Sequence, residues 1–195
     1  MRLFLALDID AQIRDRILRF VEGVRNFAPE VRWMPAESLH VTLKFIGEQP
    51  EAMAESIQQS LKTISAPPVE LQFRAYGFFP TVNSARVFWV GIESGPELAA
   101  LAASVDQQTA LLGIPKEDRA FSPHLTLARG AGCSGAPRRN KTDGPNSVFR
   151  RVQEKLSALT APDFGTMSAR EFYLYQSHLS PKGSTYTKLA AFGLK

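Results

Sequence analysis

The stretch His40-Val41-Thr42-Leu43 is followed 84 residues later by a similar one, His124-Leu125-Thr126-Leu127. The fold and the site that we expect both follow from this repeat. Two of the three histidines therefore stand in the same four-residue frame, each followed by a threonine two positions on. Apolar residues at the intervening positions are typical of a half-buried β-strand. Because side chains at i and i+2 of a strand point to the same face, each copy presents one imidazole and one hydroxyl together. We expect two equivalent strands, about 39–46 and 123–129, facing a common cavity.

The elements around these two strands predict an α+β fold. Apolar residues recur at helical spacing in four stretches, and alternating stretches mark further strands. The expected helices are Ile13–Val24, Met53–Ile64, Leu98–Leu112 and Val148–Leu159, and the expected further strands are Met1–Leu7, Val69–Ala75, Arg86–Ile92, 170–177 and 185–192. Each half of the chain then holds a pair of helices and one motif strand. We predict a bilobal duplicated unit with two mainly antiparallel sheets, helices on the outer faces and a central cleft.

The predicted domain organisation is simple. Residues 1–195 are expected to form a single domain of two pseudo-symmetric lobes, because no linker separates independent units. The segment 130–146 is rich in Gly, Arg, Lys, Ser and Pro, which is typical of a mobile loop.

The composition is that of an ordinary globular protein, with 44% hydrophobic and 22% charged residues. The formal net charge of +4 and the pI near 9.4 favour anionic partners, without by themselves indicating nucleic-acid binding. No apolar stretch approaches the roughly 18–20 residues of a membrane span, and Asp8 and Asp10 interrupt the apolar N-terminus too early for a signal peptide. The single cysteine, Cys133, excludes an internal disulfide and favours a reducing compartment. We predict a cytoplasmic monomer with no membrane contact.

The chemistry expected of the repeated motif is proton transfer. Two histidines with pKa values near neutrality can divide the work, since the neutral one removes a proton while the protonated one donates. Cleavage of a phosphodiester needs such a pair, because the attacking oxygen loses a proton and the leaving oxygen gains one on the opposite side of phosphorus. The hydroxyls of Thr42 and Thr126 can donate to the non-bridging oxygens. A single strand histidine is usually structural, but a doubled frame favours the catalytic interpretation.

Other uses of these histidines have less support in the sequence. Neither His40 nor His124 has an Asp, Glu or Cys within two positions, so we predict no metal and no cofactor. A Ser or Cys nucleophile is also disfavoured, because Cys133 falls in the loop segment and no Gly-x-Ser-x-Gly elbow is present.

The doubled motif in its surroundings resembles the 2H phosphoesterase superfamily. The stretches similar to its bacterial and archaeal RNA 2′,3′-cyclic phosphodiesterase branch, also called 2′-5′ RNA ligases, are Trp33-Met34-Pro35, Leu39–Gly47, Phe121–Arg129 and a tail with Leu174, Ser177, Leu179, Tyr186 and Leu189. This resemblance spans nearly the whole chain. It implies a bilobal fold with both motifs lining a central cleft, and hydrolysis of RNA 2′,3′-cyclic phosphate ends, or of cyclic nucleotides, to 2′-phosphates.

The resemblance also implies a role for each motif residue. His40 would donate a proton to the leaving 3′ oxygen, and His124 would accept one from water. Thr42 and Thr126 would bind the phosphate. The residues alone are symmetric and do not distinguish the acid from the base.

The sequence departs from the family pattern in places. Ser122 stands where relatives often carry arginine, so a cation near the site would be lost or supplied by Arg119 or Arg129. The segment 130–146 is longer than usual. Its basic residues are candidates for contact with an RNA backbone, although a solvated loop explains them more simply; they are Arg138, Arg139 and Lys141.

Lesser candidates flank the motifs. Strict alternation places Lys44 on the face of His40, where it would reach a phosphate or end at the surface. Three aromatic residues are candidates for stacking on a base, although large aromatics more often belong to the core; they are Trp33, Phe45 and Phe121. His178 lacks the threonine and is expected to be non-catalytic.

Two other functions stay open on the sequence. One is a reversible 2′-5′ RNA ligase or 2′-5′ phosphodiesterase acting on tRNA halves or oligoadenylate by the same chemistry. The other is a non-enzymatic module that binds RNA ends, for which a pair of acid–base groups would be unnecessary.

Overall fold

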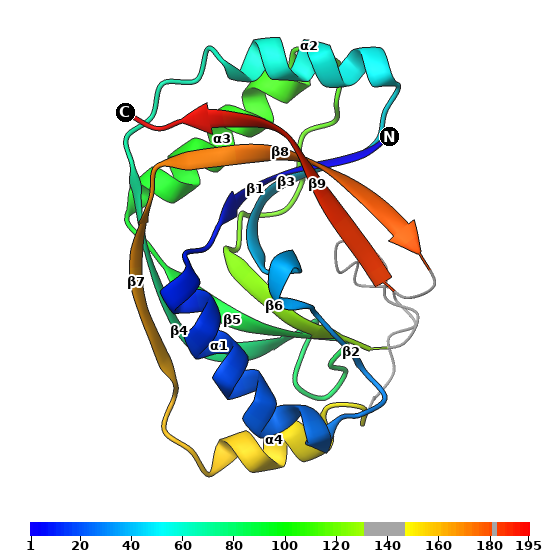
Figure 1. The fold of residues 1–195 in the computed structure, drawn as a ribbon, viewed down its shortest axis with the longest axis vertical. Helices are drawn as coiled ribbons and strands as arrows, with labels where there is room; N and C mark the ends of the chain where they lie inside the picture. Colours follow the sequence, from blue (N-terminus) through cyan, green and yellow to red (C-terminus); the bar gives the residue numbers. More distant parts are fainter. Residues whose placement is uncertain (131–146, 181–182) are drawn as a thin grey trace.

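The computed structural model describes residues 1–130, 147–180 and 183–195, in which strands and helices share one extensive hydrophobic core (Figure 1). The strands are β1 Arg2–Asp8, β2 Arg32–Trp33, β3 His40–Glu48, β4 Val69–Phe79, β5 Val87–Glu93, β6 His124–Arg129, β7 Asp163–Ala169, β8 Glu171–Ser180 and β9 Gly183–Gly193. The helices are α1 Ala11–Val24, α2 Glu51–Leu61, α3 Pro96–Ala110 and α4 Arg150–Ser157, with short 3₁₀ turns at Arg25–Phe27 and Ala36–Ser38.

The strands form a single curled sheet in the order β7-β4-β5-β6-β3-β1-β8-β9, with β2 paired to β6. Every strand pair is antiparallel, which confirms the α+β class and the mainly antiparallel arrangement. The two sheets that the sequence predicts are the two halves of this sheet. They are joined because the motif strands β3 and β6 pair with each other, through one Cα pair, Val41 with Leu125. Figure 1 shows β1, β8 and β9 in one half and β4, β5 and β6 in the other.

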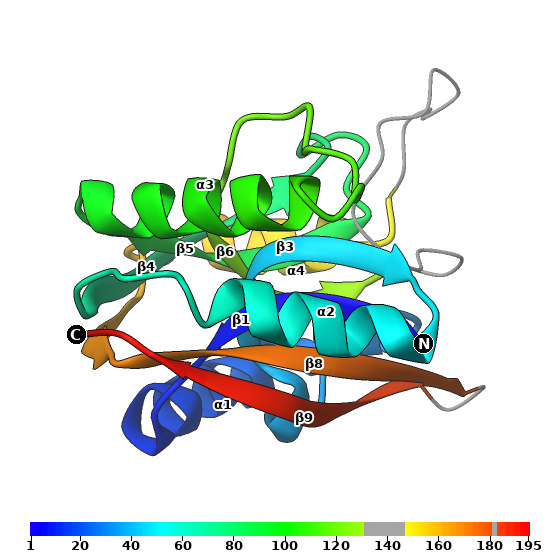
Figure 2. The ribbon, with the colours of Figure 1, turned by 90° about the horizontal axis from the view of Figure 1, so that it is seen from above.

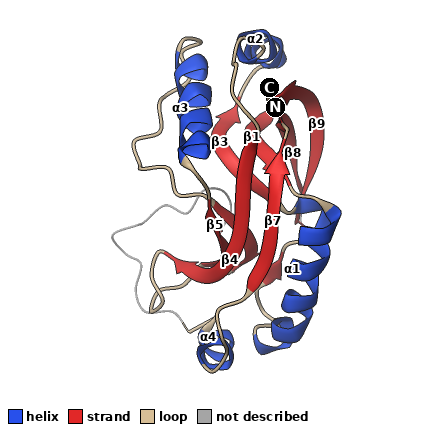
Figure 3. Cartoon of the chain, turned by 90° about the vertical axis from the view of Figure 1, so that its left-hand side faces the viewer, coloured by secondary structure: helices blue, strands red, loops and turns tan. Residues whose placement is uncertain are grey.

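The helices lie around the outside of the strands, as predicted (Figure 3). Helix α1 begins after Asp10, whose carboxylate accepts a hydrogen bond from the Ile13 amide at 2.8 Å and so caps the first turn. Helix α3 begins with Pro96, whose missing N–H and fixed φ suit a first helical position. Helices α2 and α3 contact each other, and α1 and α3 lie on opposite sides of the strands (Figure 2). None of the helices in the described ranges is long and apolar enough to span a membrane.

The two faces of the sheet differ in what they carry. Because the sheet is curled, helices on both sides of the molecule pack against the same face, which contributes Leu5, Val41 and Leu125 to the main core. The opposite face of the β1 half carries a smaller cluster formed by Phe4, Ala6 and Tyr175, with Tyr173 and Tyr186 packed against it. Alternation along β1 and β3 places the motif residues on this second face.

Two β-bulges in the pairing of β1 with β3 reverse the alternation that the sequence predicts. The register pairs Ala6 with Thr42, but then Leu5 with Lys44 and Phe4 with Phe45. Because Leu5 faces the core, Lys44 does too, and only 5% of its surface is exposed. The placement of Lys44 beside His40 was therefore wrong. Its place on that face is taken by Phe45, which is 38% exposed.

Lys44 instead ties β3 to the helix behind it. Its Nζ donates to the carboxylate of Asp106 on α3 and, at 2.9 Å, to the carbonyl of Pro115. The Glu117 amide donates to the same carboxylate at 3.1 Å, and these two donors hold the pKa of Asp106 below its usual value against the opposing effect of burial. The buried lysine is thus a structural residue that fixes β3 against α3.

The end of the chain contains one more strand than predicted. β7 precedes the two expected strands and pairs with β4 at the edge of the sheet. Its sequence, Asp163-Phe164-Gly165-Thr166-Met167-Ser168-Ala169, has few strand-forming residues, and Gly165 adopts a φ of 102° that interrupts a regular alternation. Apart from Gly130, the predicted loop 130–146 lies outside the described residues, and so do its Cys133 and its three basic residues.

Candidate active site

The motif strands β3 and β6 lie side by side at the middle of the sheet and bring the two sequence motifs together. Val41 is paired with Leu125 in antiparallel register, and both side chains are fully buried in the core. The residues flanking such a pair face each other across the strands, on the opposite side of the sheet. His40 therefore lies across from Thr126, and His124 across from Thr42. The four predicted residues form a crosswise group with local two-fold symmetry.

Both imidazoles are oriented by the same backbone contact. His40 Nδ1 lies 2.7 Å from the Ser38 carbonyl, and His124 Nδ1 lies 2.8 Å from the Ser122 carbonyl. A carbonyl oxygen accepts only, so each Nδ1 carries the hydrogen and donates it. In the neutral ring this leaves the lone pair on Nε2. Each histidine can therefore exchange a proton through Nε2 while Nδ1 holds the ring in place.

Aromatic rings surround His40. Phe4 lies 4.8 Å away between ring centroids, Tyr186 lies 5.2 Å away edge-on, and Tyr175 lies 6.3 Å away. Burial among these rings lowers the pKa of His40 to about 4, because the charged form loses its hydration. The Ser38 carbonyl and the Asp8 carboxylate oppose this shift, whereas the positive charges of Arg129 and His124 add to it.

A different pair of aromatic residues supports His124. The ring of Phe79 lies edge-on at 4.9 Å, and that of Trp89 lies at 6.2 Å. The indole of Trp89 lies against Gly77 on the neighbouring strand, where an added Cβ atom would be 2.1 Å from the ring. Burial lowers the pKa of His124, and the charge of Arg129 lowers it further against the effect of the Ser122 carbonyl. No local sequence pattern indicates Phe79, Gly77 or Trp89, because only the pairing of β4, β5 and β6 brings them to the histidine.

The two threonines complete the group. Thr42 is paired across β1 with Ala6, and Thr126 is paired across β5 with Trp89. Both are partly buried, and within the described part of the chain neither hydroxyl has a hydrogen-bond partner. Two proton-transfer groups and two uncommitted hydroxyl donors thus face one region, an arrangement suited to a tetrahedral anion.

Comparison with known proteins agrees with this geometry. The family model described as LigT like Phosphoesterase matches residues 7–89 and 90–186, so each match carries one motif. The chain belongs to this family. The RNA 2′,3′-cyclic phosphodiesterase of Archaeoglobus fulgidus is 34% identical over 98% of this chain and 99% of its own length. The resemblance to 2H phosphoesterases expected from the motifs is confirmed.

Solved structures show the same fold as this LigT-like phosphoesterase. The protein TT0787 of Thermus thermophilus aligns with a TM-score of 0.78 and 28% identity over 100% of this chain and 98% of its own. Escherichia coli LigT complexed with 3′-AMP aligns with a TM-score of 0.75 and 28% identity over 99% of this chain and 97% of its own.

One of the two candidate cations of this LigT-like phosphoesterase acts on the site. The charge of Arg129, in the last position of β6, lowers the pKa of both catalytic candidates, so it lies close to both histidines. Arg119 is instead engaged by Glu117, with its Nε 3.0 Å from a carboxylate oxygen. Of the two arginines, Arg129 is therefore the one whose charge reaches both histidines.

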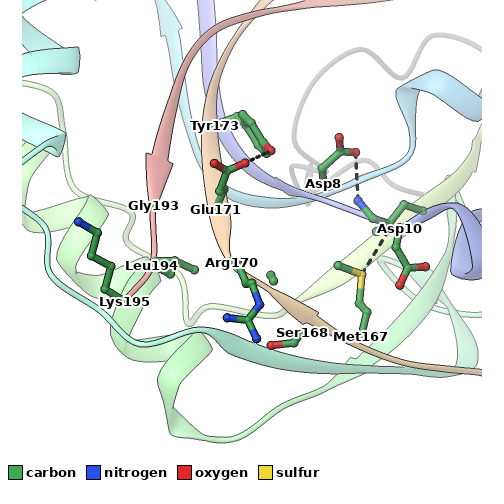
Figure 4. Close-up of a pocket in the computed structure, with 12 residues that line it drawn as sticks. Asp8, Asp10, Met167, Ser168, Arg170, Glu171, Tyr173, Gly193, Leu194 and Lys195 are labelled. Carbon is green, nitrogen blue, oxygen red and sulfur yellow. Dashed lines mark hydrogen bonds between the residues drawn. The ribbon is translucent and has the colours of Figure 1, made fainter.

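An ion-pair network and a pocket adjoin the site and were not predicted. Asp8 is the Cα partner of His40 across β1, and its carboxylate binds Arg14 at 3.1 Å and Lys188 at 2.8 Å. Beyond Asp8 lies a pocket of about 550 Å³ between the ends of β1, β7 and β9 (Figure 4). Figure 4 shows the Tyr173 hydroxyl bonded to Glu171 on its rim. Neither histidine lines this pocket, and Asp8 is the residue that it shares with the surroundings of His40.

Two other sequence candidates, Trp33 and Phe121, pack against the core, and the third histidine, predicted to be non-catalytic, has a partner of its own. Trp33 packs edge-on against Phe88 in the core and donates its indole N–H to the Ala28 carbonyl at 3.1 Å. Phe121 is half-buried against the core. His178 lies on β8 with its Nε2 3.3 Å from the Thr187 hydroxyl. In the part of the chain that the structure describes, no three His, Cys, Asp or Glu side chains are arranged to hold a metal ion.

Proposed function

We propose that this protein hydrolyses RNA 2′,3′-cyclic phosphate ends to 2′-phosphomonoesters, using His40 and His124 as a metal-independent acid–base pair. The observation that carries the proposal is the matched anchoring of both rings, each of which donates through Nδ1 to a carbonyl two residues earlier and keeps Nε2 for proton transfer. Relatives over nearly the full length carry the name RNA 2′,3′-cyclic phosphodiesterase, which supports the same substrate here.

The proposed reaction is an in-line displacement. His124 Nε2 takes a proton from water as the water oxygen bonds to phosphorus. The bond from phosphorus to the 3′ oxygen breaks on the opposite side, and protonated His40 donates through Nε2 to that oxygen. The product keeps its phosphate on the 2′ oxygen. His40 ends neutral and His124 ends protonated, so exchange with solvent restores the starting state. The assignment of acid and base follows the family.

In this proposal, neighbouring groups stabilise the negative charge of the phosphate. Thr42 and Thr126 donate to the non-bridging oxygens, and Arg129 supplies the positive charge that balances them. The low pKa of His40 in the unliganded protein fits a site that fills with an anion. The negative charge of a bound phosphate stabilises the protonated imidazole that burial disfavours. It therefore raises the pKa of His40, so that the ring can carry the proton that it donates.

The test is hydrolysis of nucleoside 2′,3′-cyclic phosphates and of an RNA oligonucleotide with a cyclic phosphate end, in the presence and absence of EDTA. We expect turnover that survives EDTA and yields the 2′-phosphate, identified by phosphorus NMR. A 3′-phosphate product would reverse the proposed leaving group. Tight binding without turnover between pH 5 and 9 would favour the RNA-end binding module.

A parallel arm with a 2′-5′-linked dinucleotide tests the ligase and 2′-5′ phosphodiesterase alternative, which uses the same acid–base pair. The prediction of a cytoplasmic monomer is checked separately by cell fractionation and by light scattering of the purified protein.

A further inference from the structure

Two cations share one carboxylate beside the first motif histidine. Asp8 is the Cα partner of His40 across β1 and β3, so the two side chains lie on the same face of the sheet. The carboxylate of Asp8 lies 3.1 Å from the Arg14 guanidinium and 2.8 Å from the Nζ of Lys188. Because two positive charges meet a single negative one, the group as a whole is positively charged.

Lys188 on β9 is the more accessible of these two cations. Its side chain is 46% exposed, whereas that of Arg14 is 28% exposed and also donates to the Ile9 carbonyl at 3.0 Å. The Nζ of Lys188 lies 3.9 Å from the centroid of the Tyr173 ring, which packs against the aromatic cluster on the face of His40. An ammonium has three N–H donors, and among the described residues only Asp8 accepts a hydrogen bond from this one. Lys188 can therefore donate to a ligand without leaving Asp8.

Stability alone does not account for this placement of Lys188. A partly exposed ion pair contributes little to the free energy of unfolding, and fixing a long side chain costs conformational entropy. A lysine that is already held by a carboxylate and an aromatic ring loses less freedom when an anion binds to it. The arrangement therefore favours a role in binding an anion beside the site.

The structure of ribose says which anion of an RNA end lies in this half of the site. In the proposed reaction the leaving 3′ oxygen lies next to His40. The carbon that bears the 3′ oxygen is bonded to the carbon that bears the 5′ group, whereas the carbon that bears the 2′ oxygen is bonded to the carbon that bears the base. The 5′ group is thus on the side of the sugar that faces His40. In an RNA chain this group is the phosphodiester to the preceding nucleotide.

The pocket beyond Asp8 offers room for the chain that continues from this phosphodiester. Asp8 and Tyr173, which both hold Lys188, also line the pocket of about 550 Å³ (Figure 4). Sites for small organic molecules usually enclose roughly 300–1,000 Å³, so the preceding nucleoside fits a space of this size. An RNA chain that passes Lys188 therefore has a cavity to enter.

We propose that Lys188 binds the 5′ phosphate of the terminal nucleotide, an inference that rests on the proposed function. Its ammonium would donate to a non-bridging oxygen of this second phosphate, while the first phosphate lies between the two histidines. Arg14 neutralises Asp8, so the carboxylate does not repel the substrate. Such a contact would make the protein prefer the end of an RNA chain to a free nucleoside 2′,3′-cyclic phosphate.

The experiment compares adenosine 2′,3′-cyclic phosphate with the same compound phosphorylated on its 5′ oxygen. We expect the wild type to have a KM about tenfold lower for the phosphorylated compound, the usual effect of one hydrogen bond between charged groups. Added salt should reduce this difference. In Lys188→Met the two KM values should become nearly equal, and Lys188→Arg should restore the difference. The dinucleotide ApA with a cyclic phosphate end should behave like the phosphorylated compound.

Lys155→Met is the matched control, because Lys155 on α4 also places its Nζ over an aromatic ring, 5.7 Å from the centroid of Phe27. It should keep the tenfold difference. The inference is wrong if the wild type does not distinguish the two compounds. It is also wrong if Lys188→Met raises both KM values by the same factor, since the lysine would then act on His40 through Asp8. Both results require an active wild type, whereas a failure of the proposed function would appear as no turnover of any of the three substrates.

Discussion

At the scale of single residues, the first prediction concerns the two motif histidines. His40→Ala and His124→Ala should each lower kcat/KM by about 10² to 10⁴, the usual contribution of one positioned acid or base. His178→Ala is the matched control, because this third histidine is exposed on β8 and bonds Thr187. It should keep full activity. Hydrolysis of a nucleoside 2′,3′-cyclic phosphate measures all three, and near wild-type rates in both motif variants would contradict the acid–base assignment.

The pH dependence of the reaction follows from the lowered histidine pKa values. The profile of kcat/KM reports the free enzyme, in which the pKa of His40 is about 4 and that of His124 is also below 6.5. The profile of kcat reports the complex, in which the negative phosphate raises both. We therefore expect two bell-shaped curves, with the maximum of kcat/KM at lower pH than the maximum of kcat. Superimposed curves centred on an ordinary histidine pKa would show that burial does not shift these groups.

Gly77 tests the support of His124 from the neighbouring strand. In Gly77→Ala the new Cβ would clash with Trp89, whose ring must move and disturb the packing around the histidine. We expect a loss of about 1–3 kcal/mol in the free energy of unfolding, the usual cost of overpacking, together with a lower kcat. Gly23→Ala is the control, because nothing lies within 4 Å of its Cβ position and alanine favours helix α1. Urea unfolding and steady-state kinetics measure both variants.

At the scale of elements, the sequence predicted the motif strands and the helices but not the irregularities of the strands. Helical spacing of apolar residues is a strong local signal, and the doubled motif is visible without any structure. A β-bulge leaves no such signal, so Lys44 was expected on the wrong face and Phe45 was not distinguished from a core residue. The support given by Phe79 and Trp89 depends on strand pairing across long sequence separations, which no local pattern records.

The next prediction follows from the corrected position of Lys44. Lys44→Met keeps the aliphatic stem but removes the ammonium that Asp106 and the Pro115 carbonyl share. Lys44 is buried, whereas the carboxylate of Asp106 is partly exposed and keeps its bond from the Glu117 amide, so the loss is that of hydrogen bonds to a charged group. The free energy of unfolding should therefore fall by about 1–3 kcal/mol. KM for cyclic phosphates should not change, because the side chain lies on the core face. A raised KM with unchanged stability would instead place the lysine on the phosphate.

At the scale of the whole molecule, the two halves meet at the site. β3 and β6 share one register pair, whereas β1 pairs with β3 along its full length, so the two halves are joined by a short strand pairing beside the histidines. The duplicated, two-lobed origin of the chain remains a proposal, supported by the separate family matches at 7–89 and 90–186 and by the equivalent carbonyl contacts of the two histidines. In this arrangement each half contributes one motif histidine and one motif threonine to the candidate site.

The burial of His40 makes the stability of the whole fold depend on pH. The pKa of this ring is about 4 in the folded protein and near 6.5 in the unfolded chain, so the unfolded state binds more protons between these values. Stability is then fully present above about pH 6.5 and is lost as the pH falls toward 4, by on the order of 2–3 kcal/mol. His124 shifts in the same direction and adds to the loss. Urea unfolding of the unliganded protein at pH 7.5 and pH 4.5 measures the difference.

A variant separates this contribution from general acid unfolding. His40→Gln has no titrating ring, so its free energy of unfolding should fall less between the two pH values than that of the wild type. His178→Gln removes an exposed histidine and should follow the wild type. Inorganic phosphate, as a ligand of the folded state alone, should reduce the acid loss in the wild type more than in His40→Gln, because its negative charge favours the protonated ring. If wild type and His40→Gln lose the same free energy of unfolding between the two pH values, burial in the folded protein does not lower the pKa of His40. The ring could then act as an acid without a bound phosphate to raise its pKa.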